Sequence, residues 1–130
     1  MDEGNPTKKK LLIADDEPNI RLLIRRIFEK DYTVFEAENG RRAVDLALRH
    51  IPDIILMDVM MPESDGLAAL NELKATESTK AIPVIMITGV GHELNERLAK
   101  SVGAKGYIRK PVKPQELFDA VSTIIRLAKT

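Results

Sequence analysis

The chain has 130 residues, in which 20 Lys and Arg balance 20 Asp and Glu, and it contains no cysteine. This length is typical of one domain with a buried core, and the zero net charge gives no field that would attract nucleic acid or an anionic membrane. The missing cysteines exclude disulfides and thiolate metal sites, and no stretch approaches the roughly 20 apolar residues that span a membrane.

The N-terminal segment is polar, contains Gly4 and Pro6, and lacks the apolar stretch of a secretory signal. We therefore expect a flexible tail at residues 1–8, one domain at residues 9–128, and a cytoplasmic protein.

Short apolar runs alternate with amphipathic segments along the rest of the chain. Strands are predicted at residues 10–14, 33–37, 54–58, 84–88 and 106–109. A helix is predicted after each strand, beginning after Pro18, after Asn39–Gly40, through Leu67–Leu73, through Leu94–Val102, and near Pro114. Five β–α units of this kind predict a parallel sheet with helices on both faces.

Apolar residues recur at helical spacing along the predicted helices, and the fourth carries Leu94, Leu98 and Val102. In the first, Arg21, Arg25 and Arg26 are expected to point mostly outward, away from the stripe. The inner positions of the first helix are Ile20, Leu23, Ile24, Ile27 and Phe28. The inner positions of the last helix are Leu117, Val121, Ile124, Ile125 and Ala128.

Strand composition also predicts the order of the strands. The first, third and fourth strands are continuous apolar runs, which suit the interior of a parallel sheet. The second strand contains Thr33 and Glu36, and the fifth contains Tyr107 and Arg109, so both are placed at the edges. The expected fold is a doubly wound, flavodoxin-like (βα)5 sandwich with strand order 2-1-3-4-5 and a switch point between strands one and three.

Polar side chains gather where the predicted strands end, which is where ligands of open α/β sheets bind. These residues are Asp15, Asp16, Asp58, Thr88 and Lys110. Three carboxylates in one crevice repel one another, and a hard dication such as Mg²⁺, which prefers oxygen ligands, relieves that repulsion. With no cysteine and no histidine at a strand end, zinc is disfavoured. A carboxylate beside Mg²⁺, a hydroxyl and a lysine is equipped for phosphoryl transfer through an aspartyl-phosphate.

This set, with Met61–Pro62, Asp65–Gly66 and Lys110–Pro111, resembles the receiver domain of two-component response regulators over about residues 9–127. The resemblance implies that Asp58 accepts a phosphoryl group from a sensor histidine kinase or a histidine phosphotransfer protein. It also implies that Thr88 and Lys110 bind the phosphoryl oxygens, and that the Lys110–Pro111 bond is cis. Such a protein is a signalling phospho-acceptor that catalyses only its own phosphorylation and dephosphorylation.

The resemblance further implies a Mg²⁺ site, in which Mn²⁺ is able to substitute. Asp16 and Asp58 would hold the ion directly, and the backbone carbonyl of Met60 would be the third protein ligand. Asp15 would act mostly through water.

Receiver domains resemble one another in a hydroxyl–aromatic switch, and Thr88 and Tyr107 match its two positions. A new dianion that recruits a nearby hydroxyl is a local event able to bias a surface. The surface implied is the fourth helix, fifth strand and fifth helix, about residues 91–128, which would control a downstream protein. No direct contact with nucleic acid or membrane is expected. Monomer and phosphorylation-dependent dimer stay open, as do a stand-alone regulator and a receiver cut from a longer one.

One departure from the family bears on kinetics. Met60 lies two residues after Asp58, and Val90 lies two residues after Thr88. In the family these two positions influence how fast the acyl phosphate hydrolyses, and neither side chain orients an attacking water. We therefore hypothesise slow autodephosphorylation.

Simpler interpretations of single residues stay open. Asp16 could cap the first helix, Thr88 could be an ordinary strand end, and Tyr107 could be an edge aromatic. His50 and His92 have no nearby ligand set, so both are expected at the solvated surface.

Three competing functions are weighed against the receiver. A haloacid-dehalogenase-like phosphatase needs a second Asp two residues after Asp58, where this chain has Met60. A flavodoxin-like flavin carrier needs a phosphate loop after the first strand, where residues 15–17 are all acidic and would repel the phosphate. A pseudo-receiver, which binds partners without phosphorylation, stays the alternative.

Overall fold

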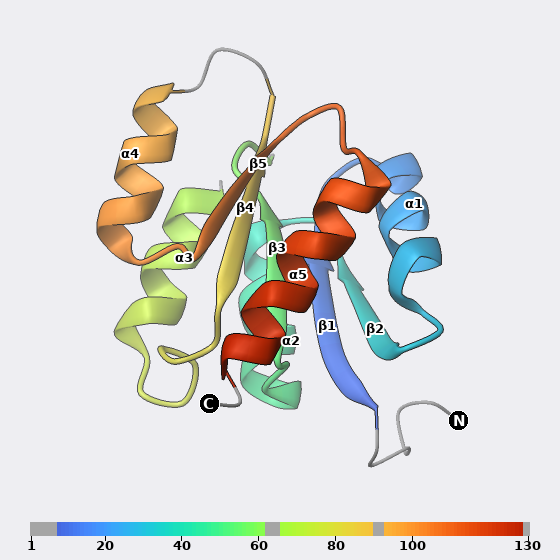
Figure 1. Ribbon diagram of the computed structural model, residues 1–130. Helices are drawn as coiled ribbons and strands as arrows, with labels where there is room; N and C mark the ends of the chain where they lie inside the picture. Colours follow the sequence, from blue (N-terminus) through green and yellow to red (C-terminus); the bar gives the residue numbers. More distant parts are fainter. Residues whose placement is uncertain (1–7, 62–65, 90–92, 129–130) are drawn as a thin grey trace.

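The computed structural model describes residues 8–61, 66–89 and 93–128, and Figure 1 shows a parallel sheet between two layers of helices. The strands are β1 (Lys9–Ala14), β2 (Tyr32–Ala37), β3 (Ile54–Asp58), β4 (Val84–Thr88) and β5 (Gly106–Arg109). The helices are α1 (Pro18–Phe28), α2 (Gly40–His50), α3 (Gly66–Ala75), α4 (Glu93–Val102) and α5 (Pro114–Ala128). The strand order is β2-β1-β3-β4-β5, which confirms the predicted doubly wound α/β fold.

The strand boundaries follow the sequence pattern closely. β3, β4 and β5 have the predicted limits, whereas β1 and β2 each begin one residue earlier, at Lys9 and Tyr32. β3 and β4 are buried at every position, and β2 and β5 form the two edges, as their mixed composition predicted. Residues 1–7 of the predicted tail lie outside the described part of the chain.

The core lies in two layers, one on each face of the sheet. Helices α1 and α5 cover one face, and α2, α3 and α4 cover the other (Figure 1). Core residues on the α1–α5 side include Leu11, Ile13, Ile24, Phe28, Ile54, Leu56, Ile85, Ile87, Leu117 and Val121. Those on the opposite side include Leu12, Ala43, Val44, Ile55, Met57, Leu70, Leu73, Val84, Met86 and Ala99. Because successive strand residues point to opposite faces, the inner strands must be apolar throughout.

Two helices differ from their expected stripes. Ala128 is exposed, because α5 makes its last core contacts through Ile124 and Ile125, one turn earlier. Among the α4 side chains that the structure describes, those of residues 97–102, Ala99 is buried and Leu98 is 45% exposed. Ala99 belongs to the core and the partly buried Val102 packs against it, so Leu98 faces solvent. Within the described ranges, no helix has both the length and the apolar character needed to cross a membrane.

The prediction that the arginines of α1 point mostly outward holds for Arg26 and is wrong for the other two. Arg21 Nε lies 3.1 Å from Glu36 Oε1, and Arg25 Nε lies 2.6 Å from Glu36 Oε2. Arg25 also donates from Nη2 to the Val34 carbonyl at 3.1 Å. The carboxylate on the edge strand attracts both guanidinium groups, and together they cover the open edge of β2.

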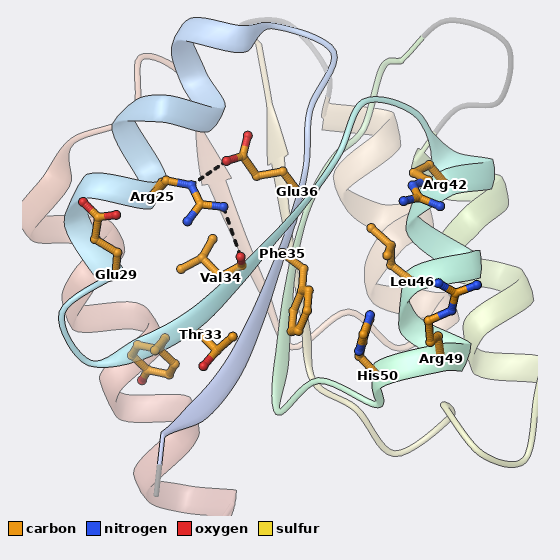
Figure 2. A pocket seen from close by; sticks show the side chains of 11 residues that line it. Arg25, Glu29, Thr33, Val34, Phe35, Glu36, Arg42, Leu46, Arg49 and His50 are labelled. Atoms are coloured by element: carbon orange, nitrogen blue, oxygen red, sulfur yellow. Dashed lines mark hydrogen bonds and ion pairs between the residues drawn. The ribbon is translucent and has the colours of Figure 1, made fainter. Parts of the chain in front are cut away.

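A hollow of about 550 Å³ lies along β2 between α1 and α2 (Figure 2). Within it the rings of Phe35 and His50 are stacked with centroids 4.1 Å apart. His50, predicted at the solvated surface, is half-buried there, because the end of α2 packs its ring on β2. His92 lies outside the described residues. The residues that line this hollow include none of the acids or the lysine at the strand ends, so it is separate from the candidate site.

Candidate functional site

Three of the predicted site residues meet at the carboxyl end of the sheet. Ala14 pairs with Met57 across β1 and β3, so Asp15 and Asp58 leave the sheet side by side. Lys110 follows β5, and its side chain reaches past β4 to both carboxylates. Lys110 Nζ lies 3.3 Å from Asp15 Oδ2 and 3.4 Å from Asp58 Oδ2.

Asp58 is the last residue of β3 and is only 4% exposed. Its Oδ1 accepts a hydrogen bond from the backbone N–H of Met60 at 3.2 Å. Burial, and then the charge of Asp15, raise the pKa of Asp58 to about 6, although Lys110 and the Met60 hydrogen bond oppose the rise. The carboxyl group is therefore close to half-protonated in mildly acidic solution.

Asp15 follows β1 directly and is fully buried. Its Oδ1 accepts a hydrogen bond from the Glu17 backbone N–H at 2.8 Å, while Oδ2 accepts none from the described residues. Burial raises the pKa of Asp15, and the Glu17 hydrogen bond and Lys110 work against that rise. One oxygen of Asp15 is thus fixed by the loop, and the other is left for a cation.

Lys110 lies where three carboxylates converge. Besides the two aspartates, its Nζ contacts Glu17 Oε1 at 2.9 Å, and the Lys110 side chain is 19% exposed. Burial by itself lowers the pKa of this ammonium, but the hydrogen bond to Glu17 and the charges of Asp15 and Asp58 raise it above the usual value. Lys110 therefore stays protonated throughout the physiological range. The Lys110–Pro111 peptide bond is cis.

Thr88 and Tyr107 lie on neighbouring strands beside this cluster. Thr88 ends β4 one residue beyond Ile87, which pairs with Asp58, so its side chain lies next to the acceptor strand. Its hydroxyl is buried and makes no hydrogen bond within the described residues. Tyr107 is partly buried on β5, where it pairs with Met86 and packs against the core.

The sequence left open whether Asp16 caps α1. Asp16 is exposed and does not cap α1, because the N-cap residue is Glu17, whose side chain makes no capping hydrogen bond. Carboxylate oxygens of Asp15, Asp16 and Glu17 all lie within 4.8 Å of one another. Glu17 had no role in the site predicted from the sequence, and its only signal there is its place as the third acid of this run.

The remaining predicted residues are placed as follows. Met60 is 55% exposed just beyond Asp58, and Met61 is buried in the core. Gly66 begins α3, and its backbone N–H donates to the Val59 carbonyl at 2.7 Å, which closes the loop after β3. Pro62, Asp65 and Val90 lie outside the described residues.

Comparisons with known proteins place this arrangement in a family. A family model for the response regulator receiver domain matches residues 11–122. The chain belongs to this family. Receiver domains are signalling proteins that act with histidine kinases, and they generally bind Mg²⁺ at an acidic pocket. In this chain residues 15–17 form an acidic cluster.

Similar sequences include both short and long regulators. The receiver domain is 37% identical over 118 residues to the chemotaxis protein CheY of Halobacterium salinarum, covering 90% of this chain and 97% of that protein. It is 39% identical over 129 residues to the transcriptional regulatory protein ResD of Bacillus subtilis, covering 98% of this chain but only 52% of ResD. The chain thus spans about half the length of this longer relative.

Solved structures show the same fold. The REC domain of AraT, a response regulator from Geobacillus stearothermophilus, superposes with a TM-score of 0.84 at 34% identity, covering 93% of this chain and 95% of that one. The chemotaxis protein CheY4 of Vibrio cholerae also gives a TM-score of 0.84, at 28% identity, covering 89% of this chain and 98% of that one.

Proposed function

We propose that this receiver domain takes up a phosphoryl group on Asp58 from a phosphohistidine of a sensor histidine kinase or a histidine phosphotransfer protein. The observation that carries the proposal is a nearly buried carboxylate in contact with a lysine ammonium at the carboxyl end of a parallel sheet. Asp58 is 4% exposed, and its Oδ2 lies 3.4 Å from Lys110 Nζ. Membership of the receiver family supports the same function.

The proposed step needs an ionised acceptor and a fixed positive charge. An oxygen of Asp58 attacks phosphorus, and a P–O bond forms as the P–N bond to the donor imidazole breaks, with its electron pair returning to the nitrogen. The pKa of about 6 leaves Asp58 largely ionised at neutral pH. Lys110 and the Thr88 hydroxyl would donate hydrogen bonds to the phosphoryl oxygens, and the raised pKa of Lys110 keeps its charge in place.

The metal proposed for the site is Mg²⁺, for which Mn²⁺ would substitute. Asp16 and Asp58 would hold it directly with the Met60 carbonyl, and Asp15 would act mostly through water. The fit is supported by the donor set, since Asp15 Oδ2 is buried without a hydrogen bond from the described residues and the neighbouring carboxylates converge. Oxygen ligands of this kind suit hard dications. When bound, the ion neutralises charge on the transferring phosphoryl group.

The proposed output is a change in the surface formed by α4, β5 and α5. The buried Thr88 hydroxyl has no hydrogen-bond acceptor among the described residues, so a phosphoryl group on Asp58 would give it one. Its movement would leave room into which Tyr107, on the adjacent strand, turns inward. The changed surface would bind a downstream protein, either as a monomer or as a phosphorylation-dependent dimer. We propose a cytoplasmic location and no direct contact with nucleic acid.

The decisive experiment is intact mass spectrometry after incubation with acetyl phosphate and Mg²⁺. Wild type should gain one phosphoryl group when Mg²⁺ is present and none when it is left out. Hydroxylamine should then remove the phosphoryl group. Asp58→Asn should gain none. Asp45→Asn, which removes an exposed carboxylate from α2, is the matched control and should behave as wild type.

The outcomes separate the proposal from its main alternative. A phosphoryl gain that persists in Asp58→Asn would assign the acceptor elsewhere. No gain in wild type, either from acetyl phosphate or from a panel of phosphorylated histidine kinases, would favour the pseudo-receiver.

A further inference from the structure

The Glu17 carboxylate is nearer to the Lys110 ammonium than either buried aspartate is. The distances from Nζ are 2.9 Å to Glu17, 3.3 Å to Asp15 and 3.4 Å to Asp58. Of the three N–H donors of this ammonium, two are matched by hydrogen bonds to Glu17 and Asp58, and Asp15 is held by the ion pair alone. We propose that Glu17 is a positioning residue that holds Lys110 in the resting receiver and has to release it when a phosphoryl group on Asp58 takes Lys110 over. This inference rests on the phosphoryl acceptance proposed for Asp58.

The local structure gives the Glu17 side chain no role in capping α1. Glu17 is the N-cap residue of α1, with φ −93° and ψ 114°, and its carbonyl accepts from the N–H groups of Ile20 and Arg21. Its own N–H donates to Asp15 Oδ1. Asp, Asn, Ser and Thr are the residues that cap helices well, and this glutamate makes no capping hydrogen bond. The backbone on both sides is therefore fixed, and the side chain is directed to Lys110 instead.

Exposure determines which of the three carboxylates gives up the ammonium. The Glu17 side chain is 57% exposed, whereas Asp15 is fully buried and Asp58 is 4% exposed. A carboxylate at the surface regains water when its ion pair breaks, but a buried one is left without compensation. Glu17 is thus the partner that separates at least cost, and Lys110 is able to turn toward the phosphoryl group while it stays near Asp15.

The exposure of Glu17 also sets how strongly its contact with Lys110 affects phosphoryl binding. Partly exposed ion pairs are weak, and breaking one changes an equilibrium by about two- to fivefold. Loss of the Glu17 contact should therefore tighten binding of a phosphoryl group or its mimic by about threefold. The hold on Lys110 is therefore modest, and it favours the resting arrangement when no phosphoryl group is present.

The test compares Glu17→Gln with Glu17→Asp, because the second keeps the charge and shortens the side chain by one methylene. Binding of beryllium fluoride in excess Mg²⁺ would be followed by isothermal titration calorimetry. The rate of phosphorylation by acetyl phosphate would be measured in parallel. Glu38→Gln is the matched control, since Glu38 follows β2 at the same end of the sheet, is exposed, and makes no described contact with Lys110.

Both Glu17 variants should bind the mimic about threefold more tightly than wild type, with Glu38→Gln unchanged. If Glu17→Asp behaves as wild type while Glu17→Gln binds more tightly, charge alone is responsible and the positioning role is wrong. Weaker binding in both variants, or no change in either, would also overturn it. If wild type binds no mimic and takes up no phosphoryl group, the proposed function itself fails, which is a separate result.

A second readout needs neither metal nor phosphoryl group. In protein labelled with ¹⁵N at the lysine side chains, the Nζ resonance of Lys110 should shift in Glu17→Gln and in Glu17→Asp, because both lose the 2.9 Å contact. The resonance should stay in place in Glu38→Gln. A Lys110 resonance that is identical in wild type and both Glu17 variants would show that the contact is not formed in solution.

Discussion

Asp15 and Asp58 stand side by side at the ends of β1 and β3 and share one ammonium, with Lys110 Nζ 3.3 Å from one and 3.4 Å from the other. One positive charge does not balance two buried carboxylates. Burial disfavours the charged form of a carboxyl group, so it raises the pKa of both acids, and the charge of Asp15 adds to the rise at Asp58. The resting site is short of positive charge, which suits it to take up a cation.

This shortage predicts that Asp58→Asn stabilises the metal-free protein, by an amount that grows with pH. The native pKa of about 6 lies above the ordinary 3.8, so between these values the folded state binds more protons than the unfolded state. The contribution of Asp58 to stability is thus fully present below pH 3.8 and is lost as pH rises through about 6. The difference amounts to at most about 3 kcal/mol.

This expectation is checked by urea unfolding in EDTA, which gives the unfolding free energies of wild type and Asp58→Asn from about pH 4 to about pH 7. Asp45→Asn serves as the control for loss of an exposed carboxylate. Excess Mg²⁺ should narrow the difference at neutral pH by stabilising wild type more than the variant. A difference between the two proteins that does not vary with pH would contradict the raised pKa.

The buried Thr88 hydroxyl predicts that a single substitution raises the stability of the resting protein and abolishes its response to phosphorylation. It is buried without a hydrogen bond from the described residues, so Thr88→Val should stabilise the resting protein by about 1 kcal/mol. Thr79 is the matched control, because its buried hydroxyl donates to the Leu73 carbonyl at 2.7 Å. Thr79→Val should destabilise by about 1 kcal/mol.

In the same Thr88→Val variant, the conformational response to phosphorylation should be lost. The measurement is the set of amide chemical-shift changes over α4, β5 and α5 on adding beryllium fluoride and Mg²⁺. Wild-type shift changes in a variant that binds the mimic normally would remove Thr88 from the switch.

Met60 predicts a long-lived aspartyl-phosphate. Its side chain is 55% exposed beside Asp58 and has no group that orients water. Met60→Asn should therefore hydrolyse faster, on the order of tenfold, which is less than full acid–base assistance supplies. Phosphoryl half-life by intact mass is the measurement, and Leu48→Asn, at an exposed position on α2, is the control. Equal half-lives in wild type and Met60→Asn would discard the explanation.

The backbone around Gly66 leaves no space for a side chain close to Asp58. A Cβ at this position would collide with the backbone carbonyl of Asp58, so Gly66→Ala forces the loop after β3 to move. We expect a loss of about 2 kcal/mol in unfolding free energy, together with slower phosphorylation. At Gly106 the nearest atoms to a Cβ would be in the side chains of Ile85 and Ile124, at 3.3 Å and beyond, so Gly106→Ala should cost less. Equal stabilities of wild type and Gly66→Ala would contradict the collision.

Much of the fold could be predicted because the relevant signals are local. The continuous apolar runs of β3 and β4 are required by burial on both faces, and the mixed runs of β2 and β5 are tolerated only at edges. Parallel strands all end at the same side of the sheet. The acids, the hydroxyl and the lysine at the strand ends can therefore be expected to lie together before any distance is known. That is why Asp15, Asp58 and Lys110 were identified as neighbours.

Other features depend on contacts between distant segments, and their sequence signals are weak. The stacking of His50 on Phe35 and the reach of Arg21 and Arg25 to β2 follow from how α1 and α2 lie on the sheet. The outward Leu98 reflects which face α4 presents to the core. Helical spacing alone leaves such choices open, because several faces of a short helix carry apolar residues.

The sequence by itself determined the parallel α/β architecture, the strand order and the identity of the acids and lysine at the strand ends, since these follow from periodicity and from the order of residues along the chain. Only the tertiary structure decided how the lysine distributes its contacts. Glu17 and Lys110 are 93 residues apart and approach to 2.9 Å because the Lys110 side chain reaches from the end of β5 past β4 and β3 to the start of α1. Exposure then distinguishes Glu17 from Asp15 and Asp58, and exposure is a property of the folded chain that residue type does not specify.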